Sequence, residues 1–303
     1  MDKKNIVVIG SLNMDWVIPV NHTPVEGETI LADGYTEVPG GKGANQACAA
    51  GKLKGNVSML GLVGDDEIGD KLINNLKLVN VDVSRIEKSE NINSGLALIN
   101  VNSKGNNSIV VLPGANGRCD IKYIEKNIDI IEKSDIVLLQ MEIPIETVEY
   151  VITVSKNLKK QVILNPAPAP DSLSDEVLSN IDILTPNETE LEKISGKNVK
   201  TVEDAIEASK SLLNRGVKNI IATLGEKGAL LVNKDEVKEF KALKVDAVDT
   251  TAAGDSFNGA MAVYLSEGHT ISEAIEFANK VSSIAVTRKG AQTSIPERSE
   301  IEI

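Results

Sequence analysis

An acidic residue near the C-terminal end of the chain stands in a pattern that suits phosphoryl transfer. The segment Asp249–Gly254 (DTTAAG) leads from small residues into a helix-like stretch whose first turn carries Asp255. Backbone N–H groups at a helix start have no partner within the helix, so the amides of residues 252–255 would bind an anion, helped by the helix dipole. A carboxylate beside that anion hole could accept the proton of an attacking hydroxyl. On spacing alone, an Asp255 that only complements the helix terminus fits equally well.

A glycine cluster, Gly40–Ala47 (GGKGANQA), is a second candidate for ligand binding. Glycines let a backbone approach a ligand closely, and these precede an expected helix. The cluster is not a Walker A loop, which needs GxxxxGK followed by Ser or Thr, and no GxGxxG motif follows the first strand. Taken alone, a tight turn before a helix explains it equally well.

Polar residues follow five apolar, strand-like runs. Open α/β sheets bind ligands beyond the carboxyl ends of their strands. Asn, Pro and Gly also form turns, so one such ending would carry no information, whereas five together favour a polar site. The five endings are Gly10–Asp15, Gln140–Glu142, Asn165–Pro168, Thr185–Glu188 and Thr223–Gly225.

The elements that must position these residues alternate between strand-like and helix-like segments, as in a parallel α/β sheet. We expect one α/β domain over residues 1–303, with a mostly parallel central sheet sandwiched by helices. Two inserted segments, about 13–38 and 95–113, break the rhythm and would pair as a small separate sheet. Expected strands are 6–9, 57–63, 136–141, 162–164, 181–184 and 220–224, and expected helices are 44–53, 66–79, 145–157, 202–215, 254–265 and 271–286.

Composition excludes several classes of protein. The formal net charge of −12 argues against nucleic-acid and anionic-membrane partners, which need a basic surface. Cys48 and Cys119 have no CxxC partner, so we expect buried free thiols rather than a zinc site. His22 and His269 are expected in exposed loops, so the base of an enzyme would not be histidine. Without a signal peptide or membrane span, a cytoplasmic protein is expected.

Taken together, these motifs resemble those of the ribokinase-like carbohydrate kinases, from end to end. Both signature regions of that family are present, Gly40–Ala47 and Asp249–Gly259, and the stretches Asn165–Ala169, Thr185–Glu190 and Ala285–Gln292 also match. The resemblance implies ATP-dependent phosphorylation of D-ribose at its 5-hydroxyl, giving ribose 5-phosphate and ADP. A kinase of deoxyribose, fructose or a nucleoside is the close alternative. A non-catalytic sugar-binding relative would predict loss of Asp255 or the glycine loop, and both are present.

The resemblance also implies roles for individual positions. Asp255 matches the catalytic base, and the backbone of Ala252, Ala253 and Gly254 matches the anion hole. Sugar-binding positions are Asn13, Asp15, Gly41, Lys42, Asn45 and Glu142, together with Asp255. Nucleotide-binding positions are Asn187, Thr223, Leu224, Gly225, Glu226, Lys227, Gly228 and Asn279, together with Gly254 and Asp255.

Two metal ions and a dimer follow from the same resemblance. Asn187 and Glu190 match an NxxE element that organises Mg²⁺ through water. The two inserted segments match a β-lid, which in this family also makes a homodimer contact. Asn279 stands where a histidine is expected beside adenine, which leaves nucleotide preference open, and Thr251 replaces an isoleucine. An activating K⁺ would bind, mostly through carbonyls, at Asp249, Thr251, Ala285, Arg288, Gly290 and Ser294.

Overall fold

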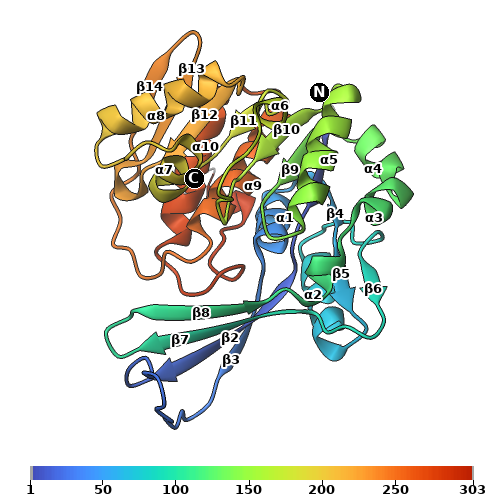
Figure 1. Ribbon diagram of the computed structural model, residues 1–303, viewed down its shortest axis with the longest axis vertical. Coiled ribbons are helices and arrows are strands. Elements are labelled where there is room, and N and C mark those ends of the chain that lie inside the picture. Colours follow the sequence, from blue (N-terminus) through green and yellow to red (C-terminus); the bar gives the residue numbers. More distant parts are fainter. Residues whose placement is uncertain (1–2, 302–303) are drawn as a thin grey trace.

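A central eight-stranded sheet forms the body of the chain in the computed structural model, which describes residues 3–301. Its order is β14-β13-β12-β11-β10-β9-β1-β4, and every neighbouring pair from β12 to β4 is parallel, which confirms the expected architecture (Figure 1). The strands are β1 (Asn5–Ile9), β4 (Asn56–Leu60), β9 (Ile136–Leu139), β10 (Gln161–Leu164), β11 (Ile183–Leu184), β12 (Asn219–Thr223), β13 (Ala229–Asn233) and β14 (Val237–Phe240).

Helices cover both faces of this sheet because its strands are apolar on both faces. In β1, Ile6 and Val8 pack into one buried cluster, and Val7 and Ile9 pack into the other. The first cluster includes residues of α1 (Lys42–Lys52), α2 (Glu67–Leu78), α9 (Ala253–Ser266) and α10 (Ile271–Ala285). The second includes residues of α3 (Ile121–Lys126), α4 (Ile128–Lys133), α5 (Ile145–Asn157), α6 (Asp175–Leu178), α7 (Glu188–Ser195) and α8 (Val202–Asn214).

Helix starts divide into two kinds, and the difference bears on the site. Asp66 caps α2 and Thr270 caps α10, each through a side-chain oxygen that accepts a backbone N–H. The residue that precedes the helix provides no capping side chain in α1 or in α9. The residues before them, Gly41 and Ala252, have φ angles of 85° and 58° instead. The start of α9 is therefore left open to a ligand, whereas the first N–H groups of α1 donate to Glu142 and Ser11.

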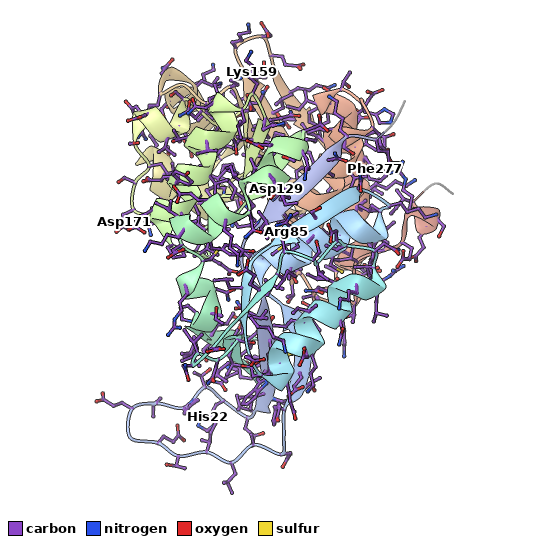
Figure 2. The ribbon with its side chains drawn as sticks, turned by 90° about the vertical axis from the view of Figure 1, so that its right-hand side faces the viewer. His22, Arg85, Asp129, Lys159, Asp171 and Phe277 are labelled. Atoms are coloured by element: carbon purple, nitrogen blue, oxygen red, sulfur yellow. The ribbon has the colours of Figure 1, made fainter. Side chains whose placement is uncertain are left out.

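A second, four-stranded sheet projects from the body, as expected for the two inserted segments (Figure 1). Its order is β3-β2-β7-β8, in which β2 pairs parallel with β7 and antiparallel with β3. Beyond β2 the chain forms a long loop that carries His22 away from the body (Figure 2). The strands are β2 (Asn13–Val20), β3 (Thr36–Gly40), β7 (Gly95–Asn102) and β8 (Asn107–Leu112).

One expected strand was wrong and one pair of strands was missed. The expected strand 57–63 breaks at Gly61, whose N–H donates to the Tyr123 hydroxyl and whose carbonyl accepts from that hydroxyl and from the Glu87 N–H. The chain continues as β5 (Leu62–Gly64), which pairs with β6 (Glu87–Ser89) in a separate two-stranded sheet. The antiparallel edge formed by β13 and β14 was missed, because no strand was expected between residues 229 and 240.

Smaller expectations are confirmed. Cys48 and Cys119 are buried free thiols, and His22 and His269 are exposed. Over residues 3–301 we find no helix with the length and apolar character needed to cross a membrane. Short 3₁₀ helices complete the described chain at η1 (Gly114–Arg118), η2 (Gly225–Lys227) and η3 (Arg298–Glu300).

Candidate active site

The start of α9 presents a carboxylate beside free backbone amides. Asp255 is the third residue of this helix, and only 5 % of its surface is exposed. The N–H groups of Gly254 and Asp255 meet no hydrogen-bond acceptor in the described part of the chain. The expectation of four free amides was wrong at Ala253, whose N–H bonds to the Thr250 carbonyl at 3.2 Å. An anion at this helix start would therefore meet three free amides, those of Ala252, Gly254 and Asp255, and the helix dipole.

Two side-chain amides of α1 hold the carboxylate of Asp255. Asn45 Nδ2 donates to Asp255 Oδ2 at 2.9 Å, and Gln46 Nε2 donates to Asp255 Oδ1 at 3.0 Å. The helices can approach this closely because Gly259 of α9 has no side chain. A Cβ there would lie 2.6 Å from the Cβ of Ala49. The two signature regions of the sequence are thus brought into direct contact.

The strand ends converge on the same place through Gln46. Its Oε1 accepts from Gln140 Nε2 at 2.7 Å, and its Nε2 also donates to Asn165 Oδ1 at 3.1 Å. Asn165 in turn donates to the Thr185 carbonyl at 3.0 Å. Three of the five expected endings therefore meet beside Asp255. Gln46 itself was not among the expected site residues, although it lies within the glycine-rich signature region.

Asn13 and Asp15 reach the site from β2, at its junction with the body. Asn13 is buried and its Oδ1 accepts from Asn116 Nδ2 at 2.7 Å, a contact that sequence reasoning missed. Glycine is required on both neighbouring strands. A Cβ on Gly95 would lie 2.1 Å from Asn13 Oδ1, and a Cβ on Gly40 would lie 2.3 Å from Asp15 Oδ2.

Glu142 closes the site from the loop after β9. Its Oε2 accepts from the Ser11 hydroxyl at 2.5 Å and from the backbone N–H of Lys42 at 2.9 Å. Lys42 is the first residue of α1 and follows Gly41, whose φ of 85° turns the chain tightly against β2. A Cβ on Gly41 would lie 2.7 Å from the Asn13 amide nitrogen, so the turn requires glycine.

Charges gather closely enough in this site to shift one another's pKa. Burial, and then the negative charges of Glu142 and Asp255, raise the pKa of Asp15 to about 7, against the opposing effect of Lys42. The pKa of Lys42 is raised, chiefly by Asp255 and against burial, with Glu142, Glu190 and Asp15 adding to the effect. Burial likewise raises the pKa of Glu190 above its ordinary value. The site therefore places one ammonium among four carboxylates.

The expected nucleotide positions fall into two groups beside α9. Asn187 forms a bridge with Thr223 and caps α7, where its N–H and Nδ2 both donate to the Glu190 carboxylate at 2.9 Å. Asn279 Nδ2 donates to the Phe240 carbonyl at 3.2 Å.

The Thr223–Gly228 segment connects these two groups. A Cβ on Gly228 would lie 2.0 Å from the Phe240 carbonyl oxygen, which places this turn against the residue that Asn279 holds. Leu224 packs into the core, so only its backbone could face a nucleotide, whereas Glu226 and Lys227 are exposed.

Five of the six positions expected around a monovalent cation lie on two adjoining loops, and the sixth, Ala285, is the last residue of α10. Asp249 joins the loops, because its Oδ1 accepts from the Thr251 N–H and its Oδ2 from the Gly290 N–H, both at 2.9 Å. Burial acts to raise the pKa of Asp249, but these hydrogen bonds outweigh it and hold the pKa below its ordinary value. Ser294 is fully buried on the second loop. The Ala285 carbonyl accepts from the Arg288 N–H at 3.0 Å, which leaves one of its lone pairs free.

Sequence comparison places this site in a known family. The family model described as pfkB family carbohydrate kinase matches residues 3–298. A ribokinase from Haemophilus influenzae is 40 % identical over 298 residues, which cover 98 % of this chain and 97 % of the relative. A deoxyribokinase from Salmonella typhimurium is also 40 % identical, over 292 residues that cover 96 % of this chain and 95 % of the relative.

Structural comparison agrees. The structure of Arabidopsis thaliana ribokinase complexed with ribose and ATP superimposes with a TM-score of 0.93 at 33 % identity. The match covers 100 % of this chain and 98 % of that one. The fold is therefore ribokinase-like, and the chain belongs to the pfkB family of carbohydrate kinases.

Proposed function

We propose that this chain transfers the γ-phosphoryl group of ATP to the 5-hydroxyl of D-ribose. The observation that carries the proposal is Asp255, a buried carboxylate fixed by Asn45 and Gln46 beside the free amides that begin α9. The ribokinase relatives, and the Arabidopsis structure with ribose and ATP, support ribose as the sugar.

The sugar site consists of hydrogen-bonding groups suited to several hydroxyls. Asn13, Asp15 and Lys42 would bind ribose hydroxyls from one side, and Asn45 from the start of α1. Glu142 holds Ser11 and the Lys42 backbone through its Oε2, and its Oε1 would accept a hydrogen bond from a sugar hydroxyl. Apolar contact for a nucleoside base is scarce, since aromatic residues make up only 3 % of the chain.

The reaction follows from the position of Asp255. The ribose 5-oxygen attacks the γ-phosphorus, a new O–P bond forms, and the bond from the γ-phosphorus to the bridging oxygen breaks, so that ADP leaves. Asp255 accepts the proton of the attacking hydroxyl. The N–H groups of Gly254 and Asp255 stabilise the charge on the transferred phosphoryl group, as in other sites built on electrostatic stabilisation.

ATP would lie along the Thr223–Gly228 turn and α10, near Asn187 and Asn279. Mg²⁺ fits the oxygen donors of Glu190 and Asn187, because this ion keeps several waters and needs only one or two protein ligands besides phosphate. When bound, Mg²⁺ neutralises phosphate charge.

An activating K⁺ is proposed between the loops that Asp249 joins. The donor set there is one carboxylate plus backbone carbonyls such as those of Thr251 and Ala285, which suits a large, weakly hydrated cation. When bound, the cation would add positive potential behind the start of α9, where the phosphoryl group is held. Asp249 itself holds the two loops together through Thr251 and Gly290.

The small sheet is proposed to act as a lid over the sugar and as the contact of a homodimer. Asp15 belongs to this sheet, so closure of the sheet over the sugar and sugar binding would be linked. Its edge strand β8 exposes four consecutive apolar residues that a second copy would cover, Ile109, Val110, Val111 and Leu112. As ATP is the phosphoryl donor, we place the reaction in the cytoplasm.

Deoxyribose is the second candidate, because a deoxyribokinase is as similar to this chain as the ribokinase named above. ADP formation should be measured with ribose, 2-deoxyribose, fructose and nucleosides, each in K⁺, Na⁺ and a bulky organic cation at equal ionic strength. We expect the highest kcat/KM for ribose, with faster turnover in K⁺. A higher kcat/KM for another acceptor would overturn the proposed substrate, and equal rates in the three cations would overturn the K⁺ site.

A further inference from the structure

A chain of three side-chain amides ends on the carboxylate of Asp255. Asn75 Nδ2 donates to Gln292 Oε1 at 2.5 Å, and Gln292 Nε2 donates to Asn45 Oδ1 at 3.1 Å. Asn45 Nδ2 then donates to Asp255 Oδ2 at 2.9 Å. In each of these three hydrogen bonds the donor N–H is directed toward the carboxylate, so each bond polarises the next in the same sense.

These hydrogen-bonded amides determine which way the side-chain amide of Asn45 is turned. A side-chain amide has one acceptor end and one donor end. Turned the other way, Asn45 would set its Oδ1 against Asp255 Oδ2, and two acceptors would face each other. The donor that prevents this is Gln292, which must find an acceptor on Asn45. Gln292 is oriented in its turn by Asn75, which needs an acceptor on Gln292.

Gln292 can fix the orientation of the Asn45 amide, because Gln292 is itself held at both its side chain and its backbone. It is 4 % exposed, and its carbonyl accepts from Lys52 Nζ at 2.9 Å. The same ammonium donates to the Ile295 carbonyl at 2.8 Å, so the loop is fixed on both sides of Ser294. Gln292 therefore connects the loop that follows α10, which Lys52 holds in place, to helix α1.

We propose that Gln292 is a positioning residue that sets the amide of Asn45 so that it donates to Asp255. The inference rests on the proposed function, in which Asp255 accepts the proton of the sugar hydroxyl. Gln292 lies behind Asn45 and acts through it alone. Its loss would free Asn45 to turn, and the carboxylate would lose one of its two fixed donors at the moment it is needed.

The test compares three variants by kcat and KM for ribose. Gln292→Met keeps the size but removes the donor, and we expect kcat to fall about tenfold, as the loss of one buried hydrogen bond predicts. Gln292→Glu offers only acceptors to Asn45, so it should turn that amide and lower kcat further than Met does. Thr293→Ala is the matched control, because Thr293 is exposed on the same loop, and its kcat should stay within about twofold of wild type.

A double-mutant cycle separates positioning from general damage. In an Asn45→Ala background, Gln292→Met should lower kcat by less than about twofold more, because its partner is already gone. Full additivity of the two losses would overturn the proposal. A Gln292→Glu variant as active as Gln292→Met would also overturn the proposal.

If the Gln292 variants do not fold, Asn75→Asp tests the same row of hydrogen-bonded amides from the half-exposed face of α2. The new acceptor at position 75 would draw Gln292 Nε2 away from Asn45. Wild-type kcat in that variant would overturn the proposal.

A measurement that does not depend on turnover distinguishes a failure of the role proposed for Gln292 from a failure of the proposed function. The Nδ2 protons of Asn45, identified in a ¹⁵N spectrum by their loss in Asn45→Ala, should exchange slowly with solvent in the wild type and faster in Gln292→Met. Unchanged exchange would overturn the role of Gln292. A wild-type enzyme that forms no ADP with ribose would overturn the proposed function instead, and it would be seen before any variant is compared.

Discussion

Asp15 and Asp255 share one site, but their surroundings differ. Asp255 has an amide donor on each oxygen. Asp15 accepts no hydrogen bond from any described residue, and burial with two nearby carboxylates raises its pKa to about 7. Asp15 is half-buried, and a half-buried carboxylate without donors can accept hydrogen bonds from a ligand. At the scale of single residues, this contrast suits one carboxylate for proton transfer and the other for binding the sugar.

The raised pKa of Asp15 predicts a pH dependence of ribose binding. If the ionised carboxylate accepts the sugar hydroxyls, binding below pH 7 must first remove a proton from Asp15. The KM for ribose should therefore be flat above about pH 7 and rise toward tenfold per pH unit below it, since binding is linked to proton release. Asp15→Asn should remove this dependence. A KM for ribose that does not change between pH 6 and 8 in the wild type would contradict the assignment.

Asp15 should also discriminate between ribose and 2-deoxyribose. A half-buried carboxylate that serves two hydroxyls is left under-satisfied when one is missing, which costs roughly 1–3 kcal/mol, so 2-deoxyribose should have a kcat/KM at least about tenfold lower. Asp15→Ala should lower kcat/KM on ribose far more than on 2-deoxyribose, because only the first substrate loses a bond. If the ratio of the two kcat/KM values is unchanged in the variant, Asp15 is not in the sugar site.

Among the elements, α1 and α9 are the two helices that position the site, and the residue that precedes each of them provides no capping side chain. The left-handed Ala252 leaves amides at the start of α9 free, whereas the turn at Gly41 lets the first amides of α1 donate to Glu142 and Ser11. An alanine in the left-handed conformation costs about 1 kcal/mol, so the open start of α9 lowers the stability of the fold by about that amount.

Gly254→Ala should separate stability from activity. A Cβ on Gly254 would contact no atom within 4 Å, and alanine is a better helix former, so the free energy of unfolding should rise by about 0.5–1 kcal/mol. The same methyl would lie where the proposed phosphoryl group approaches, so kcat should fall. Gly117→Ala in η1 is the control, since its Cβ would meet only Pro113 at 3.7 Å, and it should leave kcat unchanged. A Gly254→Ala enzyme with wild-type kcat would contradict the anion hole.

The sequence predicted the elements well wherever apolar periodicity was strong. The parallel core strands, the six expected helices and the small sheet lie close to where the pattern placed them, whereas α3, α4, α6, α7, β13 and β14 were not expected. It failed where side chains replace backbone partners, as at Gly61 with Tyr123. Gln46 and Gln292 were also missed as parts of the site, because a buried amide has no periodic signal and its role depends on partners 209 and 247 positions away.

At the scale of the whole molecule, the small sheet stands away from the body and leaves its edge strand unpaired in the single chain (Figure 1). Ion pairs occur on the body, as between Arg85 and Asp129 at 3.0 Å (Figure 2), and between the body and the small sheet, as between Lys71 of α2 and Glu37 of β3 at 2.6 Å. Val110 of β8 is 58 % exposed among apolar neighbours. An exposed apolar edge strand of this kind can pair with the edge strand of a second chain.

Val110→Glu should therefore convert a homodimer to a monomer, because the partner would have to bury a charge. Light scattering after size-exclusion chromatography measures the mass directly. Val237→Glu, on the far edge strand β14 of the main sheet, is the control and should leave the mass unchanged. A wild-type protein with the mass of one chain, or a Val110→Glu variant that stays dimeric, would contradict the proposed lid contact.

The central claim is that Asp255 accepts the proton of the sugar hydroxyl during phosphoryl transfer. Asp255→Asn tests it most directly, because the amide keeps the size of the side chain and loses the basic oxygen. ADP formation with ribose and ribose binding by calorimetry should be measured on the variant and the wild type together. We expect kcat to fall by about 10²–10⁴-fold while ribose binding remains measurable. A variant that binds ribose and retains more than about a tenth of the wild-type kcat would contradict the account.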